Sequence, residues 1–388
     1  MSARPSEKVV EILRTLVGFD TTSHRSNLAL VEWVRDYLEG HGIAATVVPN
    51  EAGDKACLFA RVGPADRPAI GLSAHTDVVP VGGQNWTSDP FTLTERENRL
   101  YGRGSCDMKG FVALVLAALP RLAAADLKTP VQLVLTYDEE TTFDGVVDAI
   151  RQLDRSWERP YALIVGEPTS MQVVDAHLSI AGMRMEITGR AAHSSAPDRG
   201  ANAIFAANEI INELVRVREE FIAHGDPTGR FDPPHSTLNV GRIRGGTAHN
   251  IVAEHCMIEF GMRGVPGLDL EAVLDRMERF AQEEVLPKLR ATAPEAEIKA
   301  ERWLFNPCLS PEPGSGAEQL AFRLAGANAT HTVTYATEAG MYQQAGIPTV
   351  VCGPGSIDQA HAPDEYIELS QLVLGEAFFD RLLAVCRA

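Results

Sequence analysis

Hydrophobic and polar residues follow two different periods along this chain. Near the N-terminus, apolar residues recur every three or four positions through residues 6–19 and again through residues 27–42, which predicts two amphipathic helices. Farther on, uninterrupted apolar runs of strand length stand between helical stretches, at residues 69–74, 131–136, 161–165 and 348–352. Continuous apolar strands that alternate with helices are typical of a parallel or mixed sheet covered on both faces.

The pattern changes between about residue 180 and residue 304. There it predicts a strand, a helix, two strands, a helix and a strand, at residues 183–188, 201–223, 236–243, 256–263, 268–290 and 297–304. A βαββαβ order is typical of a compact α+β sandwich that can fold by itself. The first pattern resumes after a Pro- and Gly-rich segment. We therefore expect a discontinuous α/β domain, residues 1–179 and 305–388, interrupted by an inserted domain at residues 180–304.

Length, charge and cysteine usage exclude several classes of protein. A chain of 388 residues exceeds the usual size of one hydrophobic core, which agrees with two domains. The net charge of -17 argues against nucleic acid or an anionic membrane as the main partner, because either binds a basic surface. The longest apolar run, residues 110–119, is too short to span a bilayer. Six cysteines without a Cys-x-x-Cys pair, and no signal peptide at the start, predict reduced thiols in the cytoplasm.

Residue types that bind metals follow the predicted strands. They are His75, Asp77, Asp138, Glu139, Glu140, Glu167 and His361, together with Asp107 before an apolar helix. Each has an ordinary structural explanation, such as an N-cap for Asp107 or a solvated turn for the acid pair. In an open α/β sheet, however, ligand sites gather beyond the carboxyl ends of the strands. The repetition at one sheet edge therefore favours a common site.

Two histidines and three carboxylates form a ligand set suited to zinc, cobalt or manganese. Carboxylates buried together repel one another and take up protons unless a cation neutralises them. Asp77 lies two positions after His75, on the same side of a strand, and is predicted to hold the second ring nitrogen. Glu139 and Glu140 point in different directions, so that one can bind metal while the other takes a proton from metal-activated water. This chemistry hydrolyses an amide or a related bond.

Six segments together resemble the M20 family of metallopeptidases and amidohydrolases. They are SAHTDVVP, YGRGSCDMKG, YDEE, GEPTS, AAHSSAPDRG and GPGSIDQAHAPDEY, and they cover nearly the whole chain in order. The resemblance implies a fold of the dinuclear zinc hydrolase type, with a mixed, mostly parallel sheet that has helices on both faces. It also implies that the inserted domain is a lid and dimerisation domain, and that the protein is a homodimer.

The family pattern implies two divalent metal ions, zinc with cobalt as the alternative, about 3.5–4 Å apart. Asp107 would bridge the two ions. His75 and Glu167 would complete one site, and Glu140 and His361 would complete the other. All five positions carry the residue type that the pattern requires.

Five further positions match residues that are not ligands in the family pattern. Glu139 matches the general acid/base, and Asp77 matches the partner of a metal-binding histidine. In the inserted domain, His193 matches a histidine that reaches the partner subunit's active site and stabilises the oxyanion. Arg263 matches an arginine that binds the substrate carboxylate, and Asn250 matches a second substrate contact. On the residues alone, a turn residue is the favoured explanation for His193. A solvated strand-end charge and an ordinary turn asparagine are the corresponding explanations for Arg263 and Asn250.

The segments STLNVGRIRGGTAHN, TEAG and GPGSIDQAHAPDEYIE are similar to the family branch that hydrolyses N2-acetyl-L-ornithine to L-ornithine and acetate in arginine biosynthesis. We expect that reaction, by metal-bound water that Glu139 activates. A succinyl-diaminopimelate desuccinylase, an aminoacylase, a dipeptidase or a glutamate carboxypeptidase would use the same machinery. The intact ligand set argues against a silent binding protein, and the lack of a dinucleotide fingerprint argues against a nicotinamide-dependent oxidoreductase.

Overall fold

The structure is a computed structural model that describes residues 4–388, and the chain divides into two units. Unit 2 comprises His177–Ser310 and Thr332–Ala336, and unit 1 comprises the rest of the chain. The inserted domain was predicted between residues 180 and 304. The sequence did not indicate the second segment of unit 2, in which Thr332 Oγ1 donates a hydrogen bond of 2.8 Å to the carbonyl of Arg230. Residues 1–3, with which the predicted first domain begins, lie outside the described part.

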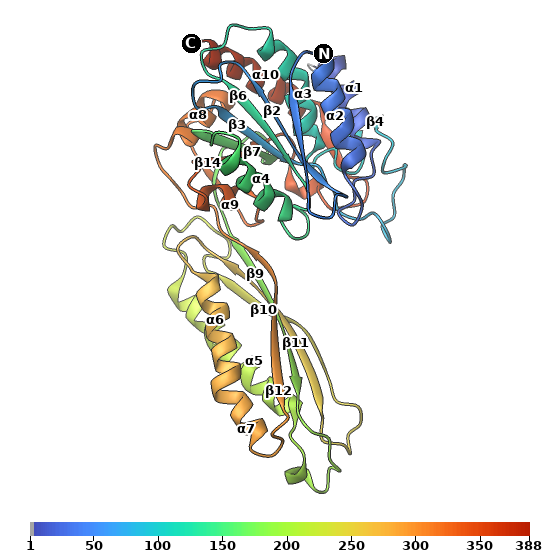
Figure 1. Cartoon of the computed structure of the whole chain (residues 1–388), viewed down its shortest axis with the longest axis vertical. Coiled ribbons are helices and arrows are strands. Elements are labelled where there is room, and N and C mark those ends of the chain that lie inside the picture. Colours follow the sequence, from blue (N-terminus) through green and yellow to red (C-terminus); the bar gives the residue numbers. More distant parts are fainter. Residues whose placement is uncertain (1–3) are drawn as a thin grey trace. The chain divides into compact units, whose positions relative to one another are not determined.

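An eight-stranded sheet lies at the centre of unit 1, in the order β1-β2-β6-β3-β7-β14-β8-β13 (Figure 1). The strands are β1 (Ala45–Pro49), β2 (Ala56–Val62), β3 (Ile70–His75), β6 (Val131–Thr136), β7 (Ala162–Pro168), β8 (Val174–His177), β13 (His331–Val333) and β14 (Thr349–Gly353). The four central strands β6, β3, β7 and β14 pair in parallel, whereas β1, β2 and β8 pair antiparallel with their neighbours. The predicted mixed sheet with a parallel centre is confirmed.

Helices cover both faces of this sheet. They are α1 (Glu7–Val17), α2 (Leu28–Gly40), α3 (Lys109–Ala123), α8 (Gly316–Ala325) and α10 (Leu369–Arg387) on one face, and α4 (Asp144–Arg155) and α9 (Ala339–Gln344) on the other. Helix α3 packs on β3 and β7 and is itself covered by α1 and α10. This double coverage explains why its sequence is apolar on nearly every side.

A small three-stranded sheet in unit 1 positions two loops of the site. Its strands are β4 (Thr94–Arg96), β5 (Arg99–Tyr101) and β15 (Tyr366–Glu368), in the order β15-β5-β4. Tyr366 pairs with Tyr101 in an antiparallel ladder. Therefore the loop that leaves β5 toward Asp107 and the loop that enters β15 from His361 start from neighbouring strand ends.

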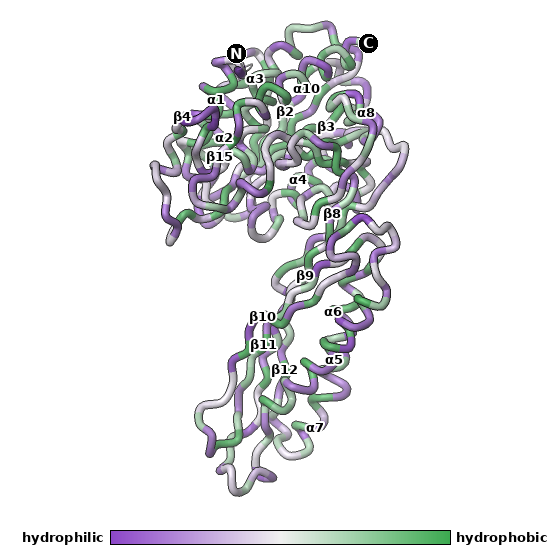
Figure 2. The backbone as a smooth tube through the Cα atoms, turned by 180° about the vertical axis from the view of Figure 1, so that it is seen from behind, coloured by the Kyte–Doolittle hydropathy of each residue, from purple (hydrophilic) through white to green (hydrophobic). Residues whose placement is uncertain are grey.

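Unit 2 has a four-stranded antiparallel sheet with helices on one face (Figure 1). The elements are β9 (Ser179–Thr188), α5 (Ala203–His224), β10 (Thr237–Gly245), β11 (His255–Gly264), α6 (Leu270–Phe280), α7 (Leu286–Arg290) and β12 (Glu297–Asn306). Hydrophobic and hydrophilic stretches alternate along α5 in Figure 2, as expected for a helix with one buried face. The helix predicted over 268–290 contains a π-helical segment, Ala281–Val285, before Pro287, which has no N–H to donate to the helical ladder.

Unit 2 has a hydrophobic core of its own, between α5, α6 and the inner face of the sheet. Alternate residues of β9 and β11 point into it, including Met183, Met185, Ile258 and Phe260. This alternation is the period-two pattern of a sheet with one buried face. The opposite face of the sheet is therefore open to carry other residues.

Residues 4–388 contain neither a membrane-spanning helix nor a disulfide. None of the helices in residues 4–388 combines the length and apolarity needed to cross a bilayer. The six cysteines are unpaired, and all are buried except Cys308, which is half-buried. Burial keeps most of these thiols away from oxidants in solution.

Candidate metal centre

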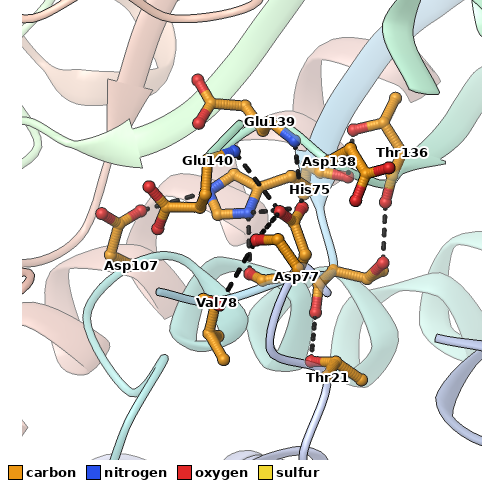
Figure 3. A network of polar contacts seen from close by, with 12 residues as sticks. Thr21, His75, Asp77, Val78, Asp107, Thr136, Asp138, Glu139 and Glu140 are labelled. Carbon is orange, nitrogen blue, oxygen red and sulfur yellow. Dashed lines mark hydrogen bonds and ion pairs between the residues drawn. The ribbon is translucent and has the colours of Figure 1, made fainter. Parts of the chain in front are cut away.

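Seven predicted residues lie together in unit 1, beyond the carboxyl ends of β3, β6, β7 and β14. They are His75, Asp77, Asp107, Glu139, Glu140, Glu167 and His361. Figure 3 shows His75 between Asp77 and Asp107, with Glu140 on the side of Asp107 and Glu139 above the ring. Parallel strands end at the same sheet edge, which is why residues from distant parts of the chain converge here.

His75 is fully buried at the end of β3. Its Nε2 lies 3.2 Å from Asp107 Oδ1 and 3.6 Å from Glu167 Oε1. Its Nδ1 lies 3.0 Å from the backbone carbonyl of Asp77 and 3.5 Å from the Asp77 carboxylate. Burial alone would lower the pKa of His75, but the carboxylates of Glu167, Asp107 and Asp77 raise it well above its usual value. A proton on Nδ1 would leave the Nε2 lone pair facing the acids.

The Asp77 carboxylate has a second role that the sequence did not indicate. It accepts hydrogen bonds from Ser23 Oγ at 2.7 Å and from the backbone N–H groups of Glu139 and Glu140 at 3.1 and 3.3 Å. Burial alone would raise the pKa of Asp77, but its bonds with His75 and Ser23 and the N–H of Glu139 lower it. Asp77 therefore holds the turn that carries both glutamates. The neighbouring Asp138 instead forms an ion pair with Lys55.

Asp107 lies between the two histidines of the cluster. Its Oδ1 faces His75, and its Oδ2 lies 3.2 Å from His361 Nε2, which is also 2.9 Å from Glu140 Oε2. Burial would raise the pKa of Asp107, but hydrogen bonds from His361 and His75 hold it well below its usual value. Asp107 does not cap α3, whose N-cap is Met108 without a side-chain bond. Its two oxygens thus face two different histidines.

Glu167 is a buried acid whose surroundings disfavour its negative charge. Its Oε1 is buried and has no hydrogen-bond partner. Burial and the charge of Asp107 raise the pKa of Glu167 well above its usual value. The close approach of α3 fixes its position, since a Cβ on the preceding residue, Gly166, would lie 2.1 Å from the ring of Phe111. A divalent cation would give this oxygen a partner and remove the repulsion.

Glu139 and Glu140 occupy different sides of the cluster. Ligand atoms lie within 4.8 Å of one another in two groups, which are His75 with Glu139 and Glu167, and His75 with Asp107 and Glu140. Burial raises the pKa of Glu139 well above its usual value, and it raises the pKa of Glu140 to about 7. The nitrogen and carboxylate donors fit zinc, cobalt or manganese in both groups.

His193 and Asn250 lie in adjoining segments of unit 2. A β-bridge joins His193 to Ile251, and the N–H of Ser194 donates to the carbonyl of Asn250 at 3.0 Å. His193 Nδ1 lies 2.7 Å from Ser195 Oγ and accepts the Ser195 N–H at 3.2 Å. Because Nδ1 is the acceptor, Nε2 carries the ring proton and is a hydrogen-bond donor on an exposed side chain.

Arg263 lies at the end of β11, on the open face of the unit 2 sheet. It is exposed and forms no ion pair within residues 4–388. It lines a groove of about 490 Å³ with Trp303, whose indole lies over Gly182. Arg242 lines the same groove, but its guanidinium pairs with Glu259 at 2.7 Å. Of these two arginines, Arg263 is the one available for an anion.

Two buried acids near the cluster were not singled out from the sequence. Glu338 accepts hydrogen bonds from Ser73 Oγ at 2.5 Å and Thr136 Oγ1 at 2.8 Å, close to the ends of β3 and β6. Glu365 is 1% exposed and binds the loop that carries Asp107. Both occur within motifs that resemble the M20 family, but nothing in the local pattern marks them as buried.

Comparison with known proteins identifies the family. A model of peptidase family M20/M25/M40 matches residues 71–385. The chain is 35% identical over 356 residues to acetylornithine deacetylase from Pasteurella multocida, with 91% of this chain and 90% of that protein covered. The chain belongs to the M20 family. The resemblance noted in its motifs is confirmed.

Solved structures of the M20 family share the fold. Aminopeptidase PepT from Bacillus cereus superposes with a TM-score of 0.73 at 21% identity, over 97% of this chain and 98% of that chain. A dinuclear metal-binding peptidase of the M20 family from Bacillus subtilis superposes with a TM-score of 0.67 at 18% identity, over 98% and 97%. These similarities confirm the predicted fold class.

Proposed function

We propose that this chain is a metal-dependent amidohydrolase that converts N2-acetyl-L-ornithine to L-ornithine and acetate, a step of arginine biosynthesis. The placement of Asp107 between His75 and His361 carries the reaction type. The similarity to an acetylornithine deacetylase over 91% of the chain supports the substrate. The six unpaired cysteines support the cytoplasm as the compartment.

The proposed cofactor is a pair of divalent ions, zinc with cobalt as the alternative. The proposed ligands are His75, Asp107, Glu140, Glu167 and His361. The unpartnered Glu167 oxygen and the mutual repulsion of the buried acids support this proposal, and the Bacillus subtilis relative binds two metals. When bound, such ions lower the pKa of water and polarise a carbonyl group.

Glu139 is the proposed proton carrier. Its carboxylate lies beside His75 and Glu167, and Asp77 fixes its backbone N–H at 3.1 Å. From this position the carboxylate would take a proton from the attacking water and pass it to the departing amine nitrogen. Asp77 has a supporting role, since it orients both His75 and the turn of Glu139.

Three residues of unit 2 are proposed to act on the substrate. Nε2–H of His193 would donate to the oxyanion in the active site of the partner subunit. The Arg263 guanidinium would bind the substrate carboxylate through two parallel hydrogen bonds. Asn250 would make a further contact, and its place beside the His193 segment supports joint action.

A homodimer formed through unit 2 is part of this proposal. Strand β10 lies at the edge of its sheet, and residues 241–250 are exposed. Next to it, Phe205 of α5 is 72% exposed and Ile243 of β10 is 54% exposed. A second copy would cover this apolar edge and pair with the open strand. Phe205→Asp combined with Ile243→Asp should give a monomer by light scattering, and an unchanged dimer would place the interface elsewhere.

The experiment that tests the function is ornithine release from N2-acetyl-L-ornithine by metal-stripped protein, before and after zinc or cobalt is added. Activity that appears only with metal supports both reaction and substrate. If metal binds but no ornithine is released, the substrate assignment is wrong, and a panel of acyl amino acids would identify the correct one.

A further inference from the structure

Two loops that carry proposed metal ligands begin at the same β-ladder. Residues 102–107 follow β5 and end at Asp107, and residues 361–365 run from His361 to β15. The Tyr101–Tyr366 pair joins the strands at the point where both loops leave them, and the N–H of Gly102 donates to the carbonyl of Glu365 at 2.9 Å. The loops that carry Asp107 and His361 are therefore anchored at the same point, the Tyr101–Tyr366 pair.

The Glu365 carboxylate organises the first loop. Its Oε1 accepts the backbone N–H groups of Cys106 and Asp107 at 2.9 and 3.0 Å. Its Oε2 accepts the N–H of Gly104 at 3.0 Å and Nη1 of Arg103 at 2.7 Å. Both oxygens are thus fully used by one short loop. The last of the backbone donors belongs to Asp107 itself.

Arg103 and Gln84 continue the network to the second ligand. Arg103 Nη2 donates to Gln84 Oε1 at 2.7 Å, and Gln84 Nε2 donates to the backbone carbonyl of His361 at 2.9 Å. Trp86 supports the glutamine, because its Nε1 donates to Gln84 Oε1 at 3.0 Å. A continuous chain of hydrogen bonds therefore connects the backbone of Asp107 to the backbone of His361.

The second loop, residues 361–365, has a strained backbone that hydrogen bonds from outside the loop hold in place. His361 and Asp364 have φ values of 60° and 55°, a left-handed conformation that is unfavourable for residues other than glycine. Asp364 accepts hydrogen bonds of 2.9 Å from the N–H and the hydroxyl of Thr87. The His361 side chain is 52% exposed, so its place depends on its backbone more than on packing.

We propose that Glu365, Arg103 and Gln84 are positioning residues that hold Asp107 and His361 at a fixed separation. The network sets the spacing of these two side chains before a metal arrives, which reduces the reorganisation that binding requires. This inference rests on the proposed function, since Asp107 and His361 are metal ligands only under that proposal.

The variant Gln84→Glu tests the network at its most accessible point. Glutamate keeps an acceptor for Arg103 and Trp86, but it replaces the donor to His361 with an oxygen. We expect the affinity for Co(II) to fall about tenfold or more for one of the two ions, with a changed visible absorption spectrum. We also expect kcat to fall about tenfold while KM for N2-acetyl-L-ornithine stays within about twofold.

Gln319→Glu is the matched control. Gln319 Nε2 donates to the carbonyl of Gly314 at 2.8 Å, a bond of the same kind on α8, away from the cluster. The control should bind Co(II) as the wild type does. Gln84→Glu with the wild-type affinity and spectrum would overturn the positioning role. If the wild type binds Co(II) without releasing ornithine, only the substrate proposal fails, and if it binds no Co(II), both proposals fail.

Discussion

The residues proposed to bind metal and those proposed to act on the substrate from the inserted domain are held in different ways by the two units. In unit 1, the side chains of His75, Asp107 and Glu167 are at most 6% exposed, and His75 contacts both acids. In unit 2, His193 and Arg263 are exposed. Buried groups that contact one another are preorganised, whereas exposed groups acquire their geometry from a ligand or from a second subunit.

The two units also differ in what makes them stable. Unit 2 has an apolar core beneath its sheet, and it forms ion pairs at its surface, such as Arg184 with Glu259 and Arg276 with Glu213. Unit 1 contains buried acids that repel one another, and burial raises the pKa of Glu139 and Glu167 well above the usual range. A bound cation would remove this repulsion in unit 1.

Replacement of the proton carrier should give the largest effect. Glu139→Gln removes the group that takes and returns the proton but keeps the size of the side chain. We expect kcat/KM to fall by about 10²–10⁴, with two metal ions still bound by elemental analysis. Glu140→Gln is the contrasting neighbour and should lower the metal content. Full activity of Glu139→Gln with its metals in place would contradict the assignment.

Replacement of His193 should give the second-largest effect on activity. His193→Ala removes a donor to the oxyanion and should lower kcat by about 10²–10³, with the Co(II) affinity of unit 1 unchanged. His255→Ala is the control, because His255 is an exposed histidine on β11 in the same unit. If both variants keep the wild-type kcat, His193 has no part in the reaction.

His177 sharpens the contrast with His75, because it is a buried histidine without a carboxylate beside it. Burial lowers the pKa of His177 to about 4, from an ordinary value of 6.5. Below pH 6.5 the unfolded chain therefore binds a proton at His177, whereas the folded chain binds this proton only below about pH 4. Stability is full above pH 6.5 and decreases by about 3 kcal/mol as the pH falls through this window. Urea unfolding at pH 7 and pH 5 should show about 2 kcal/mol more loss for the wild type than for His177→Asn. Equal losses would show that His177 does not titrate in this window.

The smallest effect is expected for the replacement of Arg263, one of the two arginines that line the groove of unit 2. Arg263→Lys keeps the positive charge but loses the planar pair of donors. KM for N2-acetyl-L-ornithine should rise about tenfold, with little change in kcat. Arg242→Lys serves as the control, because Arg242 lines the same groove and is already paired with Glu259. Equal KM values for the two variants would remove Arg263 from substrate binding.

The convergence of the cluster was predictable because apolar strands end where ligand residues begin, as at His75 and Glu167. The hydrogen-bond partners of those residues could not be predicted. The Asp77 carboxylate was expected to hold His75, yet the Asp77 carbonyl is nearer, and the carboxylate binds the N–H groups of Glu139 and Glu140. Such bonds depend on loop geometry, which periodicity does not encode.

Contacts between distant segments of the chain could not be predicted from the sequence either. Glu365 binds Arg103 across 262 positions of the chain. An acid before a strand and an arginine between glycines are common in any sequence. Only the folded ladder of β5 and β15 brings them together, so that their role emerges from the tertiary structure alone.

The two ends of the larger segment of unit 2, His177–Ser310, meet at one point, where the N–H of His177 donates to the carbonyl of Leu309 at 3.2 Å. An insertion whose ends adjoin leaves the surrounding fold undisturbed, whatever its own length. In evolutionary terms, such a segment can vary in length or sequence with little effect on the host sheet, apart from residues 332–336, which belong to the same unit.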